Sequence, residues 1–218
     1  IYDFPFRKYF EWMLILPLAI PTFINAIAYV GLTDYAGPIR QILRSMGADF
    51  YMDVMNHTGA IIIMGLVLYP YVYLLARASF RQQSSTVFLV ARTLGATPVS
   101  AFWRVALPMA RPAIAGGALL AIMETIADYG TVAYFNVQTF ATGIYQAWFS
   151  LGNRGAAAQL AICLLMFALL VAGLERAQRG RAGTSAKGQR FDVMERQVLR
   201  GKAAAIAFVI CALPVSVG

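Results

Sequence analysis

The chain has 218 residues, of which 60% are hydrophobic and only 13% are charged, and its mean hydropathy is +0.64. A soluble domain of this length carries about 25% charged residues, so the composition excludes an ordinary soluble globular protein. The net charge of +8 is concentrated in two intervals, 77–111 and 176–202, that separate apolar runs. This distribution is typical of the cytoplasmic loops of a membrane protein and not of a nucleic-acid-binding surface.

Two apolar segments near the N-terminus are long enough to cross a bilayer, which takes about 20 helical residues. The first, Trp12–Leu32, contains Pro17 and Pro21, so we expect a helix that is kinked where the prolines remove backbone hydrogen bonds. The second, Thr58–Ala76, carries no charge. Residues 31–56 between them are charged and are predicted to form a loop outside the membrane.

Two further spans are predicted beyond the first basic interval. Pro112–Phe135 is apolar but is interrupted by Glu124 and Asp128, and Gly155–Leu174 is apolar and carries no charge. The intervening residues 136–154 are polar and aromatic, and we expect a loop with a short surface helix there.

The order of apolar and charged segments predicts that the chain is divided into three regions. Residues 1–180 form a first membrane domain, 181–200 a flexible cytoplasmic linker and 201–218 the start of a second membrane domain. Because the last apolar run stops at the end of the sequence, we expect the chain to be an internal piece of a longer protein. Four crossings place the N-terminus, the 77–111 loop and the 175–202 interval on one side. That side carries fifteen of the eighteen Lys and Arg residues and is therefore predicted to be cytoplasmic.

The basic interval between the second and third spans contains a distinctive motif. Leu89-Val-Ala-Arg-Thr-Leu-Gly95 is followed, after nine further residues, by Val105-Ala-Leu-Pro108. Gly95 is expected just past a helix end, where a positive φ is needed. Thr97-Pro98 is a start signal for a second short helix, which Pro108 is expected to end. The residues alone leave open whether the two helices contact a partner or rest on lipid headgroups.

The motif resembles the cytoplasmic loop of binding-protein-dependent ABC importers, whose pattern is Glu-Ala-Ala, three residues, Gly, nine residues and Ile-x-Leu-Pro. The chain matches this pattern at Ala91, Gly95, Leu107 and Pro108, with Val105 in place of Ile and Leu89 in place of Glu. The resemblance implies that residues 89–108 dock into a groove on a cytoplasmic ATPase and carry its closure into the membrane. The missing Glu leaves open how strongly this half couples.

Further stretches resemble the ferric-iron permease family of ABC importers, up to about Gly180. They are Leu16–Pro21, Ala28–Leu32, Asp34–Gly37, Ala127–Phe135, Thr139–Tyr145 and Ala147–Phe149. The resemblance implies an all-α, polytopic transmembrane helical bundle of the ABC importer permease (MetI-like) type, with a cytoplasmic coupling-helix loop. It also implies two homologous membrane halves in one polypeptide.

The same resemblance implies the function and the partners. The chain is expected to be a multi-pass inner-membrane subunit that translocates ferric iron delivered by a periplasmic binding protein. Cytoplasmic ABC ATPase subunits, expected as a dimer, would drive it. The sequence contains no Gly-rich phosphate-binding loop, so we expect ATP and magnesium on those subunits, no cofactor on this chain and no enzyme activity of its own.

Three polar residues within the spans are candidates for the substrate pathway. Glu124 and Asp128 lie four residues apart and share one helix face. Carboxylates within a span are costly and usually face a bundle interior or a watery cavity. Because oxygen ligands suit a hard cation such as ferric iron, both are weak metal-ligand candidates. The alternative is that they bond to neighbouring helices or loop amides. Asn25 is likewise either a pathway residue or a helix-packing amide.

Other functions are compatible with these features. A related ABC permease for thiamine, polyamine, sulfate or another small solute would share the loop. An ion-gradient-driven secondary transporter would need a proton or sodium site, for which Glu124 and Asp128 are the only candidates. A membrane anchor or receptor that does not transport would tolerate disruption of the loop.

Overall fold

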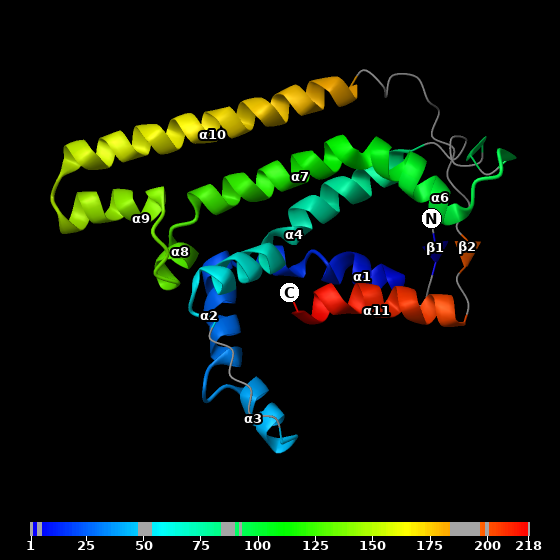
Figure 1. Ribbon diagram of the computed structural model, residues 1–218, viewed down its shortest axis with the longest axis horizontal. Coiled ribbons are helices and arrows are strands. Elements are labelled where there is room, and N and C mark those ends of the chain that lie inside the picture. Colours follow the sequence, from blue (N-terminus) through cyan, green and yellow to red (C-terminus); the bar gives the residue numbers. More distant parts are fainter. Residues whose placement is uncertain are drawn as a thin grey trace. The chain divides into compact units, whose positions relative to one another are not determined.

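The computed structural model describes residues 2–3, 6–47, 54–83, 90–91, 93–183, 197–198 and 201–217. Apart from one parallel pair of two-residue strands, β1 (Tyr2–Asp3) and β2 (Gln197–Val198), the regular elements in these residues are helices (Figure 1). The predicted all-α polytopic membrane fold is therefore confirmed. The chain forms two compact units. Unit 1 comprises Ile1–Ile15, Pro70–Ala121 and Val171–Gly218, and unit 2 comprises Leu16–Tyr69 and Ile122–Leu170.

Three helical stretches of the described residues are long and apolar enough to cross a membrane. They are α4 (His57–Gln82), the continuous stretch Val99–Ala127 and the Arg154–Leu174 part of α10. A fourth candidate is the pair Arg7–Ala19 and Thr22–Ser45, which is bent by 99°. These four candidates overlap the four apolar segments predicted from the sequence.

The first predicted span is broken, as its prolines indicate. It consists of α1 (Arg7–Met13), the 3-10 helix η1 (Leu16–Ala19) and α2 (Thr22–Thr33). Pro17 lies inside η1 and Pro21 directly precedes α2, where neither residue has an N–H for a continuous helix to use. The predicted kink is thus confirmed. A short helix, α3 (Pro38–Ser45), then lies in the loop that was predicted to be extramembrane.

The prediction that Pro108 ends the second helix of the loop is wrong. The helix α6 (Pro98–Ala101) passes through a π-helix, η2 (Phe102–Ala106), directly into α7 (Leu107–Ala127). Pro108 is the second residue of α7. In the π turn the Leu107 N–H bonds to the Phe102 carbonyl, five residues back. We attribute the continuity to this wider turn, which relieves the contact between a proline ring and the preceding turn.

Two other boundaries also differ from the prediction. The third span ends at Ala127 and not at Phe135, and a separate short helix, α8 (Gly130–Tyr134), follows it. The fourth helix, α10 (Arg154–Gly183), runs nine residues past the predicted end of the span at Leu174 and includes the first three residues of the predicted linker, 181–200. Glu, Arg, Ala and Gln dominate this extension and all favour helix, which the glycines in it do not interrupt. Residues 184–196 lie outside the described part.

The loop predicted at 136–154 contains the expected surface helix. The helix α9 (Phe140–Tyr145) continues into a π-helix, η3 (Gln146–Ser150). Thr139 caps α9, because its hydroxyl accepts from the Thr142 N–H while the Thr142 hydroxyl accepts from the Thr139 N–H. The last described helix is α11 (Lys202–Val217), which packs against α1 in unit 1.

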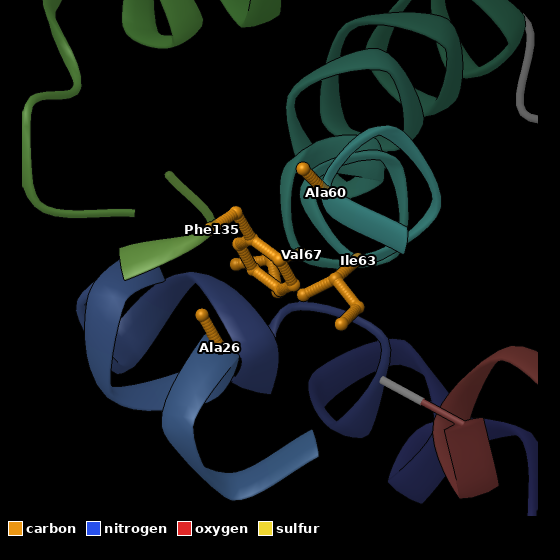
Figure 2. Packing of buried hydrophobic residues seen from close by; sticks show 5 residues of the cluster. All are labelled: Ala26, Ala60, Ile63, Val67 and Phe135. Carbon is orange, nitrogen blue, oxygen red and sulfur yellow. The ribbon is translucent and has the colours of Figure 1, made fainter. Parts of the chain in front are cut away.

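The buried core of unit 2 joins α2, α4 and the residue that follows α8. Figure 2 shows five side chains that converge there: Ala26, Ala60, Ile63, Val67 and Phe135. The Phe135 ring fills the space beside two alanines and is only 3% exposed. This core holds α8 against α2, and Gly130 at the start of α8 allows the close approach, since a Cβ there would lie 3.2 Å from the Phe23 Cβ.

Within unit 1, α4 and α7 cross at a glycine. A Cβ on Gly117 would lie 2.6 Å from the Val72 Cα and 2.9 Å from the Tyr71 carbonyl oxygen, whereas a Cβ on Gly116 meets no atom within 4 Å. We therefore expect Gly117→Ala to lower the free energy of unfolding by about 1–3 kcal/mol, the usual effect of overpacking.

Gly116→Ala is the matched control and is expected to leave stability unchanged or slightly raised, because alanine favours helix. Thermal melting of the detergent-solubilised variants measures both effects. Equal melting temperatures for the two variants would contradict this account of the crossing.

Candidate functional site

The first helix of the predicted loop ends at Gly95 as expected. Gly95 has a φ of +86°, the left-handed conformation that glycine adopts at little cost. The Ala96 N–H donates to the Ala91 carbonyl at 3.0 Å, which is the six-residue bond of a Schellman helix end. Ala91 therefore contributes its backbone to the bend. Leu89, which occupies the position of the missing Glu, lies outside the described residues.

The second helix of the loop starts at the predicted cap. The Thr97 hydroxyl accepts from the Ser100 N–H at 3.2 Å, and Pro98 is the first residue of α6. This is the arrangement that the Thr-Pro signal predicts. Val105, Leu107 and Pro108 are all partly buried in the continuous helix that follows. The motif positions thus shape the backbone, and they are not the most exposed part of the loop.

Among the described residues of the loop, the most exposed apolar side chains were not among the predicted site residues. Leu94 is 83% exposed, Val99 68% and Trp103 62%. Val99 and Trp103 are four residues apart on a helical stretch and therefore share one face. We call residues 90–91 and 93–106 the coupling segment. Its bend and these side chains give it an exposed apolar surface. Exposure cannot be read from a motif, and only the helical spacing of these residues hinted at the face.

Asp128 has a structural role in unit 2. Its Oδ2 accepts from the Thr22 hydroxyl at 2.6 Å, and its Oδ1 accepts from the Thr131 N–H at 2.8 Å. The carboxylate thereby caps α8 and ties it to the first residue of α2 (Thr22–Thr33). Both carboxylate oxygens therefore accept bonds from a neighbouring helix and from a backbone amide, which is the structural alternative to a pathway role.

Glu124 lies one turn before Asp128 and is exposed. The Asp128 N–H donates to the Glu124 carbonyl at 3.0 Å, so the helical spacing that places both on one face is present. Within the described residues, however, no cluster of three or more His, Cys, Asp and Glu side chains gathers around them. Of the two predicted metal-ligand candidates, Glu124 is the one whose carboxylate is open to a ligand.

Asn25 stabilises the break in the first span. Its side-chain amide is buried and donates to the Pro17 carbonyl at 3.3 Å and to the Ile20 carbonyl at 3.2 Å. The Pro17 carbonyl lacks its usual helical donor because the residue four positions later is Pro21. The Pro17 carbonyl accepts instead from the Ile20 N–H at 3.4 Å and from the Asn25 amide, so Asn25 packs the break of the span.

A hollow lined by aromatic side chains was not predicted. It is open and apolar, has a volume of about 440 Å³ and is lined by Tyr129, Ala141, Ile144, Tyr145, Trp148 and Phe149. The Tyr145 ring lies 4.7 Å from both the Tyr129 and the Phe149 ring centroids. The sequence signal that could have found it is the spacing of the aromatic residues 145, 148 and 149, which places them on one side of a helix. The stretch formed by α9 and η3 brings these rings beside Tyr129.

Comparison with known proteins gives relatives with several substrates. The chain is 30% identical to the Fe(3+)-transport system permease protein FbpB 2 of Haemophilus influenzae over 83% of this chain and 32% of that protein. It is 27% identical to the molybdenum permease ModB of Mycobacterium tuberculosis over 56% of this chain and 46% of that protein. It is also 27% identical to the sulfate permease CysT of Salmonella typhimurium over 61% and 47%.

The chain thus spans between about a third and a half of the length of these relatives, all of which are named as transport permeases. The model of one family, described as binding-protein-dependent transport system inner membrane component, matches residues 2–182. With its capped and bent coupling segment between membrane-spanning helices, this chain belongs to the family of binding-protein-dependent inner-membrane transport components.

Proposed function

We propose that this chain is part of the permease of an ATP-driven importer and that the coupling segment docks on a cytoplasmic ATPase. The observation that carries the proposal is the backbone of this segment, bent at Gly95 and restarted at Thr97, with exposed apolar side chains at Leu94, Val99 and Trp103. An exposed apolar cluster on a helical bend is favourable only where a partner or lipid covers it. The family supplies an ATPase as that partner.

The proposed topology follows from the charges. The coupling segment, the N-terminus and the linker region lie in the cytoplasm, because the basic residues gather there. Residues 31–56 and 136–154 then face the periplasm and receive the substrate-binding protein.

We also propose that α11 begins a second membrane half. The strands β1 and β2 pair in parallel, and in both places a helix begins five residues after the strand does, α1 at Arg7 and α11 at Lys202. Equivalent segments that lie parallel suggest an approximate two-fold relation between two halves.

Ferric iron is the substrate we favour. The ferric relative matches 83% of the chain, whereas the molybdenum and sulfate relatives match about 60% or less. The exposed Glu124 carboxylate favours a cation along this face. An oxyanion is the second candidate. Both carboxylate oxygens of Asp128 accept hydrogen bonds within unit 2. The Asp128 carboxylate is therefore a weaker argument against an anionic substrate than a carboxylate without such bonds would be.

The experiment that tests the proposal uses vesicles containing the full-length chain, its ATPase and its binding protein. Uptake of labelled ferric iron, molybdate and sulfate is measured in parallel, with a hydrolysis-dead ATPase as control. We expect iron uptake that is lost with the dead ATPase. Oxyanion uptake would retain the importer and reject iron. Uptake that follows membrane potential and not ATP would indicate a secondary transporter.

A further inference from the structure

The C-terminal end of α4 is attached to α1 by an ion-pair cluster in unit 1. Glu11 of α1 accepts from the Arg7 Nε at 2.9 Å, and its second carboxylate oxygen accepts from Arg77 of α4. The Glu11 and Arg77 side chains are only about a quarter exposed. Charge-assisted hydrogen bonds are roughly twice as strong as neutral ones, and partial burial reduces their screening by salt.

The same end of α4 is attached to the coupling segment. The Phe80 ring stacks on the Phe102 ring, with centroids 5.9 Å apart and an interplanar angle of 28°. The Gln83 side-chain amide, one residue past the end of α4, donates to the Ala106 carbonyl at 2.9 Å. Phe102 and Ala106 are the first and last residues of η2, so both contacts hold the π-helical part of the segment.

The two attachments use neighbouring positions of one helix. Arg77 and Phe80 are three residues apart, which places them on adjacent parts of the same helix face. The end of α4 therefore connects α1 with η2, and a displacement of η2 is passed to α1 through a few specific side chains. A π-helical turn is rare and is frequently found at a functional site.

We propose that Glu11 and Gln83 are positioning residues for coupling, which hold α1 and η2 on the end of α4 so that the three move together. The inference rests on the proposed function, because it needs an ATPase that moves the coupling segment. It gives the partly buried Glu11 a role in coupling, whereas Glu124 and Asp128 were considered for the substrate pathway. Neither residue contacts the ATPase in this account, and both act through the helix that they hold.

The test measures ions taken up per ATP hydrolysed by the full-length chain, reconstituted with its ATPase and binding protein. We expect Glu11→Gln to lower this ratio about tenfold, as loss of a charge-assisted hydrogen bond predicts, while binding-protein-stimulated ATP hydrolysis persists. Lys8→Gln removes an exposed charge from the same helix and is the matched control. Its ratio is expected to stay at the wild-type value. A merely structural role would lower uptake and hydrolysis together.

Gln83→Ala serves as the second variant if Glu11→Gln fails to insert into the membrane. Gln82→Ala, an exposed amide one residue earlier, is its control. We expect Gln83→Ala to lower the uptake ratio and Gln82→Ala to leave it unchanged. If both Glu11→Gln and Gln83→Ala take up as many ions per ATP hydrolysed as the wild type, this inference is overturned and the proposed function is not. Absence of ATP-driven uptake by the wild-type chain, for each of the three solutes, would overturn the proposed function together with it.

Discussion

Gly95→Pro is expected to abolish ATP-driven uptake by the full-length protein. Gly95 has a φ of +86°, whereas the proline ring holds φ near −65°, so the bend between the two helices of the coupling segment cannot form. The bond from the Ala96 N–H to the Ala91 carbonyl depends on that bend and is lost with it. Because Leu94 lies directly before the bend and Val99 follows it, the exposed apolar surface is rearranged. Uptake into vesicles and co-purification of the ATPase in detergent measure the two consequences.

Gly95→Asn is the matched control for this position. Asparagine adopts the left-handed conformation more readily than other residues with a side chain, and no atom lies within 4 Å of a Cβ at Gly95. We expect this variant to keep ATPase binding and most of the uptake. If Gly95→Pro binds the ATPase and transports as well as Gly95→Asn does, the coupling segment does not have the role proposed for it.

Asp128→Ala is expected to destabilise unit 2 by about 2 kcal/mol, since it removes hydrogen bonds to a charged acceptor. The Thr22 hydroxyl and the Thr131 N–H lose their acceptor together, so α8 is released at its start and from α2. Thr131 is fully buried, which makes its N–H costly to leave without a partner. Thermal melting and limited proteolysis of the loop between α8 and α9 measure the loss.

Thr22→Val distinguishes a structural Asp128 from a pathway Asp128. It removes the hydroxyl donor but leaves the carboxylate, so we expect it to reproduce part of the destabilisation and to be non-additive with Asp128→Ala in a double-mutant cycle. Glu124→Gln is the comparison for the pathway. If Asp128→Ala has wild-type stability but a raised KM for uptake, the carboxylate acts on substrate and the capping role is secondary.

Features set by a few consecutive residues could be predicted from the sequence. The broken first span follows from Pro17 and Pro21, whose rings remove backbone donors in any surroundings. The positive φ of Gly95 and the cap at Thr97 follow from local backbone chemistry in the same way. The membrane-spanning segments were found because apolar length is a property of composition.

Features that depend on contacts between distant segments required the tertiary structure. The two acids of the predicted third span are both carboxylates on one helix face, and the sequence assigned them the same candidate role. In the structure Asp128 meets Thr22, 106 residues earlier in the chain, and becomes a cap, while Glu124 remains exposed. Pro108 has the residues of a helix end, but the π turn before it carries the helix onward. The attachment of Glu11 to Arg77 and of Gln83 to Ala106 likewise joins residues that no local pattern connects. Sequence therefore determined the apolar segments, the break at Pro17 and Pro21, the bend at Gly95 and the helix start at Thr97, because those depend on composition or on short-range backbone effects. Only packing decided what each polar side chain does, because a partner far along the chain satisfies it.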